Sequence, residues 1–136
     1  MEKNYHISAN RESRAIAGLS MGGAETLRVA PSNLHKFAYI GIFSMGLQEG
    51  ADAAVISDFI QRNAKFFANP DQTNKLVKLF WIGVGKNDQT VTDGPRKLSE
   101  LLKQHGIKHQ FHESEGGHTW INWRQYLRDF AQLLFK

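Results

Sequence analysis

The chain contains no cysteine, and only three of its 136 residues are proline. Without cysteine it can form no disulfide bond, thiol nucleophile or thiolate metal site. It also lacks an apolar stretch near the length of about 18 residues that a membrane-spanning helix needs, and no apolar signal-peptide core stands at its start. The sequence therefore predicts no membrane partner.

Charge of one sign is not concentrated anywhere. Lys and Arg number 17 against 13 Asp and Glu, which gives a net charge of +4, and no run of like charges marks a nucleic-acid groove. Hydrophobic residues make up 41% of the chain, with nine Phe, three Tyr and three Trp among them. The composition predicts a folded domain with a substantial core and no nucleic-acid partner.

Metal and nucleotide motifs are absent as well. His105, His109 and His112 suggest a metal helix by spacing, but Gly106 would break that helix, and positions 109 and 112 point to opposite faces of a strand. Residues 83–86 lack the Ser or Thr that follows lysine in a phosphate-binding loop. We interpret the three histidines as surface residues and predict no metal and no cofactor.

The most informative motif is Gly18-Leu19-Ser20-Met21-Gly22-Gly23, which follows a short apolar run. A serine between glycines after a strand is typical of a nucleophile elbow, where a strand turns sharply into a helix and presents the serine Oγ. A Cβ at Gly18 or Gly22 is expected to crowd this turn. The backbone N–H of Met21, directly after the serine, would serve as one oxyanion donor.

An acid and a base follow in the order serine, acid, histidine, each after its own strand-like run. Asp88 comes after the apolar residues 79–84, and His118 comes after residues 108–113. Asp93 is a second acid candidate, but its place before a helix fits N-terminal capping instead. We predict that His118 takes the Ser20 proton while Asp88 orients the imidazole, so that an ester forms an acyl-enzyme.

Strand and helix patterns alternate along the chain, which predicts an α/β fold with four parallel strands in chain order and helices on both faces. In such a sheet all three candidate residues reach the same carboxyl edge. The expected strands are 14–19, 38–44, 79–85 and 108–113, and the expected helices are 22–29, 53–67, 95–105 and 120–135. The last helix should pack inward through Trp123, Tyr126, Leu127, Phe130, Leu133 and Leu134.

The elbow, residues 35–41, the acid turn 85–88 and Gly116-Gly117-His118 with Trp123 together resemble the esterase D-like α/β-hydrolases. Among these the chain is most similar to the feruloyl and acetyl-xylan esterases of carbohydrate esterase family 1. The resemblance implies a serine esterase acting on acetyl or feruloyl esters of xylan, in a parent protein that is secreted or periplasmic. Siderophore esterases and S-formylglutathione hydrolases share the same arrangement and stay open as alternatives. Trp120 and Trp123 flank the base and could stack on substrate, although Trp123 could equally anchor the last helix.

The family domain is considerably longer and places further strands before the elbow, so we expect residues 1–136 to be the C-terminal half of one α/β-hydrolase domain. The second oxyanion donor would then come from a loop outside this chain. The strand that ends at Ser20 would also keep one unpaired edge, which predicts a homo-oligomer formed through that edge. The alternative function is therefore a catalytically impaired, self-associating esterase fragment.

Overall fold

A computed structural model describes residues 4–136. Four strands form one parallel sheet in chain order: β1 (Ala15–Leu19), β2 (Tyr39–Phe43), β3 (Leu79–Gly85) and β4 (Gln110–Ser114). All residues of β2 and β3 are buried, because these two central strands are covered on both faces. The predicted α/β fold with four parallel strands is confirmed.

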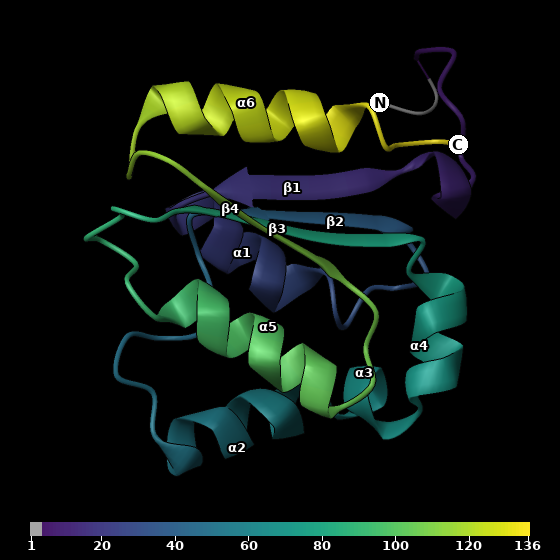
Figure 1. Cartoon of the computed structure of the whole chain (residues 1–136). Helices are drawn as coiled ribbons and strands as arrows, with labels where there is room; N and C mark the ends of the chain where they lie inside the picture. Colours follow the sequence, from purple (N-terminus) through teal and green to yellow (C-terminus); the bar gives the residue numbers. More distant parts are fainter. Residues whose placement is uncertain (1–3) are drawn as a thin grey trace.

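Helices cover both faces of this sheet (Figure 1). On one face lies α6 (Trp120–Ala131) alone, and on the other lie the remaining helices of residues 4–136. These are α1 (Met21–Val29), α2 (Ala53–Arg62), α3 (Ala64–Ala68), α4 (Pro70–Leu76) and α5 (Gly94–Gln104), while a short 3-10 helix (Arg11–Ser13) precedes β1. Each face has its own hydrophobic core.

The core under α6 is largely aromatic. Phe43 of β2 packs edge-on against Trp81 of β3 at a ring distance of 5.4 Å, and Phe130 of α6 packs on Phe43 at 5.8 Å. Tyr126, one turn earlier on α6, is also buried and packs beside Trp81. The contacts of Phe130 and Tyr126 fix the position of α6 relative to the centre of the sheet. They also fix the loop that precedes α6.

Two helix predictions need correction. The single helix expected over 53–67 is interrupted at Asn63, whose side chain donates to the carbonyl of Phe59 at 2.9 Å and so ends α2. A further helix, α4, was not predicted, and it begins at Pro70 because proline suits the first turn of a helix.

The predicted strand 108–113 is displaced to Gln110–Ser114, since the N–H of Lys108 donates to the Asn74 side chain instead.

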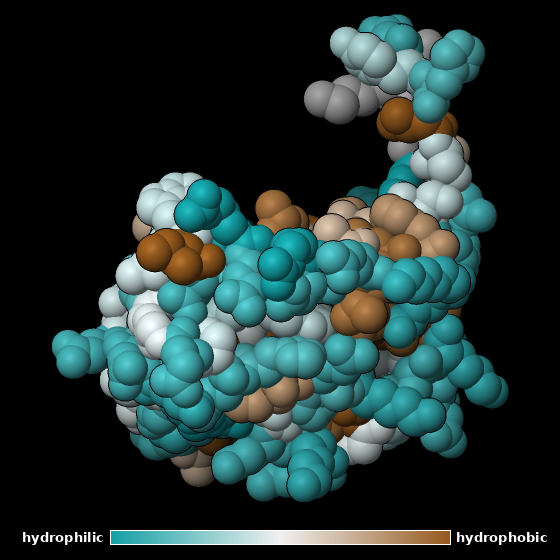
Figure 2. Space-filling model, turned by 45° about the horizontal axis from the view of Figure 1, so that its top comes forward, coloured by the Kyte–Doolittle hydropathy of each residue, from teal (hydrophilic) through white to brown (hydrophobic). Residues whose placement is uncertain are grey.

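The last helix also differs from its prediction. It ends at Ala131 instead of continuing to residue 135, and Leu127, expected inside, is 56% exposed. Figure 2 turns the α6 side forward and shows hydrophobic groups there among larger hydrophilic areas. Across residues 4–136, no helix is long and apolar enough to cross a membrane.

The elbow between β1 and α1 depends on one glycine more than on the other. A Cβ on Gly18 would lie 2.1 Å from the carbonyl oxygen of Gly22, whereas a Cβ on Gly22 would meet nothing within 4 Å. The expectation that both positions are crowded is therefore wrong for Gly22. Of these two positions, Gly18 is the one that has to be glycine for the strand to pass this close to the helix backbone.

We predict opposite effects of the two alanine substitutions. Gly18→Ala should lower the free energy of unfolding by about 3 kcal/mol or more, because the clash is with backbone that cannot rotate away. Gly22→Ala should raise it by about 0.5–1 kcal/mol, because alanine favours the helix. Urea titration followed by tryptophan fluorescence measures both, and equal effects of the two variants would contradict this account of the elbow.

Candidate active site

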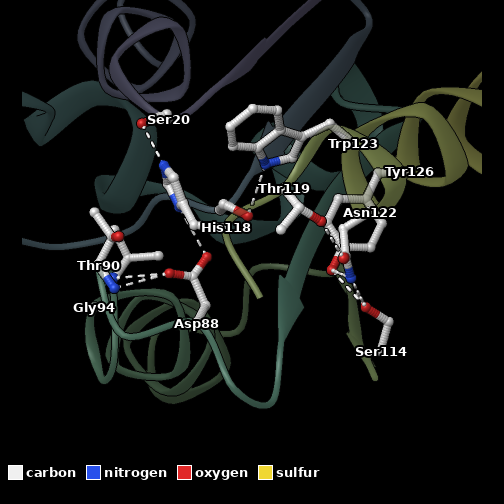
Figure 3. Close-up of polar contacts among 12 residues, drawn as sticks. Ser20, Asp88, Thr90, Gly94, Ser114, His118, Thr119, Asn122, Trp123 and Tyr126 are labelled. Carbon is white, nitrogen blue, oxygen red and sulfur yellow. Dashed lines mark hydrogen bonds and ion pairs between the residues drawn. The ribbon is translucent and has the colours of Figure 1, made fainter. Parts of the chain in front are cut away.

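Ser20, Asp88 and His118 lie together at the carboxyl edge of the sheet, after β1, β3 and β4 respectively (Figure 3). His118 stands between the other two: its Nε2 is 2.9 Å from Ser20 Oγ and its Nδ1 is 2.9 Å from Asp88 Oδ2. A carboxylate only accepts hydrogen bonds, so Nδ1 carries the proton. In the neutral ring Nε2 is then free to accept from the Ser20 hydroxyl.

Ser20 occupies a strained backbone position, with φ 50° and ψ −121°. Such a conformation costs a non-glycine residue about 1–3 kcal/mol. Two hydrogen bonds hold it: its N–H donates to the Phe43 carbonyl at 2.8 Å, and its own carbonyl accepts from Ala24 at 3.1 Å. The strain directs the side chain toward His118 and leaves the N–H of Met21 at the first turn of α1, where the helix supplies no acceptor.

Asp88 is the most enclosed of the three residues, with its side chain fully buried. One carboxylate oxygen accepts from the backbone N–H groups of Thr90 and Val91, at 3.0 and 3.2 Å. The other oxygen is left for His118. Because both oxygens accept hydrogen bonds, the buried charge is compensated, and the carboxylate has only one orientation open to it.

The acid and base loops are tied directly to each other. A Cβ on Gly85 would lie 2.4 Å from the Gly116 carbonyl oxygen, which shows how closely the loops after β3 and β4 approach. The N–H of Asn87 donates to that same carbonyl at 2.9 Å. Lys86 pairs with Glu115 at 2.6 Å, and this carboxylate raises the pKa of Lys86 above its usual value. The pair therefore persists at neutral pH and would be lost as the pH rises through the raised pKa.

Asn122 is a buried residue that the sequence analysis did not single out. Its amide donates to Ser114 Oγ at 2.8 Å and to the Glu115 carbonyl at 2.6 Å, and its oxygen accepts from Thr119 Oγ1 at 2.9 Å. These bonds connect the loop on either side of His118 to the start of α6. The sequence did carry a signal for this buried role, because an asparagine in the first turn of the predicted helix lies on the same side as the inward-facing Tyr126.

The two tryptophans near the base differ in their surroundings. Trp123 lies edge-to-face with the His118 ring at 4.9 Å, and its Nε1 donates to the buried Ser44 Oγ at 3.0 Å. Trp120 is 68% exposed and packs only one edge against Trp123, at 5.3 Å. Trp123 is thus partly buried and held beside the base, while Trp120 is available to a ligand.

Asp93 makes no contact with His118 and does not cap α5 with its side chain. Its carboxylate pairs with Lys97 at 2.7 Å. The cap comes instead from Glu49, which accepts from the N–H groups of Asp93 and Gly94. The predicted capping role was wrong because a residue far away in sequence reaches the helix start.

The three histidines whose spacing suggested a metal helix each contact a different part of the protein. His109 bonds Ser99 Oγ at 2.7 Å, His105 packs on Phe67 at 5.0 Å, and His112 stacks on Trp81 at 4.9 Å. Of these three, His112 is exposed and His105 and His109 are half-buried, so each keeps part of its side chain at the surface. Within residues 4–136, no group of three or more metal-ligating side chains is placed to hold an ion.

A family model for esterases matches residues 1–133. The chain belongs to this Esterase family. It is 32% identical, along its whole length, to an endo-1,4-beta-xylanase/feruloyl esterase of Xylanibacter ruminicola, and 27% identical over 97% of its length to an acetyl esterase of Caldicellulosiruptor saccharolyticus. Among solved structures, a CE1 ferulic acid esterase from Anaeromyces mucronatus superposes on 99% of the chain with a TM-score of 0.75 and 25% identity.

The chain spans only part of each of these esterases. It covers 16% of the Xylanibacter protein, 58% of the Caldicellulosiruptor protein and 48% of the Anaeromyces structure. The resemblance to carbohydrate esterase family 1 is confirmed by these relatives. The residues that the family model matches, 1–133, include Ser20, Asp88 and His118.

We predict that Asp88→Asn preserves the fold but reverses the His118 tautomer. The asparagine oxygen can still accept from Thr90 and Val91, which turns the amide NH₂ toward His118 Nδ1 and moves the ring proton to Nε2. A protonated Nε2 cannot take a proton from Ser20, so hydrolysis should fall by about ten-thousandfold. Nitrogen chemical shifts of His118 report the tautomer. Asp93→Asn is the matched control, and a tautomer change there, or none in Asp88→Asn, would contradict the assignment.

Proposed function

We propose that this chain carries the catalytic residues of a serine carboxylic-ester hydrolase that works through an acyl-enzyme. The observation that supports this best is the continuous hydrogen-bond chain from the buried Asp88 through His118 to Ser20. The strained elbow adds to it, since strain at an exposed nucleophile is a recurrent feature of hydrolase sites.

In the first step His118 Nε2 takes the Ser20 proton while Oγ attacks the ester carbonyl carbon. The tetrahedral intermediate collapses as the C–O bond to the alcohol breaks, and the alcohol leaves with the proton from His118. Water then gives a proton to His118 and attacks the acyl-enzyme, which releases the acid and restores Ser20. Asp88 stabilises the imidazolium formed in both steps and keeps its Nε2 directed at Ser20.

Negative charge develops on the carbonyl oxygen during each attack. In our proposal the N–H of Met21 donates to that oxygen, since it follows Ser20 at the positive end of α1. One such donor is worth about 2.7–4 kcal/mol in the transition state. A second donor would lower the activation free energy by a similar amount. The rate measured for this chain therefore depends strongly on how many donors surround the oxyanion.

For the substrate we propose acetyl or feruloyl esters of plant polysaccharide such as xylan. Two relatives support this class, one described as an endo-1,4-beta-xylanase/feruloyl esterase and one as an acetyl esterase. The exposed ring of Trp120, two residues after His118, offers a surface on which a sugar or an aromatic acyl group can stack. A carbohydrate-linked ester is therefore the proposed binding partner.

Hydrolysis of p-nitrophenyl acetate tests the proposed nucleophile. Ser20→Ala should reduce the rate to that of the buffer, because no other group among residues 4–136 takes the place of Oγ beside His118. Ser57→Ala, which changes an exposed serine on α2, is the control and should keep the rate of the unchanged chain. Equal rates for Ser20→Ala and the unchanged chain would refute the proposal. Methyl ferulate, acetylated xylan and S-formylglutathione then distinguish the proposed substrate class from its alternatives.

The open edge of β1 supports a second proposal, self-association of the chain. No strand within residues 4–136 pairs with that edge. Arg14 and Ser20 direct their backbone groups to β2, so by alternation Ala15, Ala17 and Leu19 direct theirs outward. A row of outward N–H and C=O groups is a template for a further strand, and a second copy of this chain offers the same edge.

Ala17→Pro is designed to remove the central outward N–H without disturbing the bonds to β2. Proline is compatible with an edge strand, and Ile16 before it is already extended. We expect sedimentation at high micromolar concentration to show dimers for the unchanged chain and for the control Ala17→Ser, but monomers for Ala17→Pro. A monomeric unchanged chain would refute self-association through this edge.

A further inference from the structure

The end of β2 lies beneath the proposed site and carries a feature that the triad does not use. Ser44 is the first residue after β2, is fully buried, and has φ 48°, a left-handed conformation that costs a serine about 1–2 kcal/mol. A glycine would adopt this backbone without that cost. The serine side chain at this position therefore calls for an explanation in its contacts.

Its contacts lead to the base. Ser44 Oγ accepts a hydrogen bond from Trp123 Nε1 at 3.0 Å, and the Trp123 ring lies perpendicular to the His118 ring at 4.9 Å and 88°. The backbone of Ser44 is held independently, since its N–H donates to the Gly83 carbonyl at 2.7 Å. Within residues 4–136, the Ser44 hydroxyl therefore has Trp123 as its one hydrogen-bond partner. Because Ser44 follows a buried strand, this bond holds the indole against a rigid part of the fold.

We propose that Ser44 and Trp123 are positioning residues for His118, an inference that rests on the proposed esterase mechanism. The His118 side chain is 20% exposed and lies on a loop. If only its two hydrogen bonds held it, the ring could move away from Ser20 whenever either bond breaks. Both bonds change during catalysis, because the ring gains and loses a proton at Nε2. The Trp123 ring does not titrate, and it occupies the space beside the imidazole throughout the cycle.

The same strand end also holds the nucleophile. The Phe43 carbonyl accepts from the Ser20 N–H at 2.8 Å, one residue before the Ser44 hydroxyl accepts from Trp123. Residues 43 and 44 thus set the nucleophile and the base against one common reference in the core of the sheet. A small misplacement of either group is costly in rate, which gives this shared support a functional value beyond stability.

The test uses Trp123→Phe, Ser44→Ala and the double variant, with Arg124→Ala on the exposed side of α6 as the control. In the esterase assay each single variant should lose about tenfold in kcat with little change in KM, as expected when a hydrogen-bonded support is removed. The double variant should be no slower than the slower single variant, because both changes break the same connection. Urea titration identifies any loss of rate that comes from unfolding.

A second measurement does not depend on esterase activity. Proton NMR of the His118 Nδ1–H should show exchange with water at least several-fold faster in both single variants than in the unchanged chain and in Arg124→Ala. Folded variants with unchanged exchange, or additive losses in the double variant, would overturn the proposal. If the unchanged chain is inactive but the exchange differs as expected, the positioning role stands and the proposed function fails.

Discussion

Burial of β2 and β3 from both faces is the constraint on which the rest of the molecule depends. All twelve residues of these strands are buried, five in β2 and seven in β3, so the sheet holds only if helices cover each side. Parallel strands require right-handed crossovers, and these bring every strand end that leads into a helix to one edge. The site residues therefore meet because the core had to be covered, and not through attraction among themselves, which would be too weak to order three loops.

Within that frame the site is supported by backbone contacts far more than by its own polar side chains. Gly18 passes within contact of the Gly22 backbone, Gly85 approaches Gly116, and the Ser20 N–H reaches the Phe43 carbonyl. Close approach of main chain to main chain leaves little freedom to the side chains that follow. The strain at Ser20 and Ser44 is tolerated because backbone hydrogen bonds to the neighbouring strands hold both positions.

Much of this could be predicted from the sequence, and the failures have two causes, local signals that were not weighed and contacts between distant parts of the chain. Strand order, the elbow and the grouping of Ser20, Asp88 and His118 follow from local pattern and chain order. The break at Asn63 and the start of α4 at Pro70 rest on local features, the bond from the Asn63 side chain to the Phe59 carbonyl and the fit of proline to a first helical turn. The exposure of Leu127, by contrast, depends on which face of α6 packs on the sheet. Likewise Glu49 caps α5 from far away in the chain, where a local rule selected Asp93.

The sequence by itself determined the order of strands and helices and the residue types at the carboxyl edge, because periodicity and turn chemistry act over a few neighbouring residues. Only the tertiary structure decided what surrounds those residues. The hydrogen bond from Trp123 to Ser44 joins positions 79 apart in the chain, and that from Ser20 to His118 joins positions 98 apart. Contacts between residues so far apart in the chain are set by how the sheet twists and how the helices pack on it. No local sequence pattern encodes that arrangement.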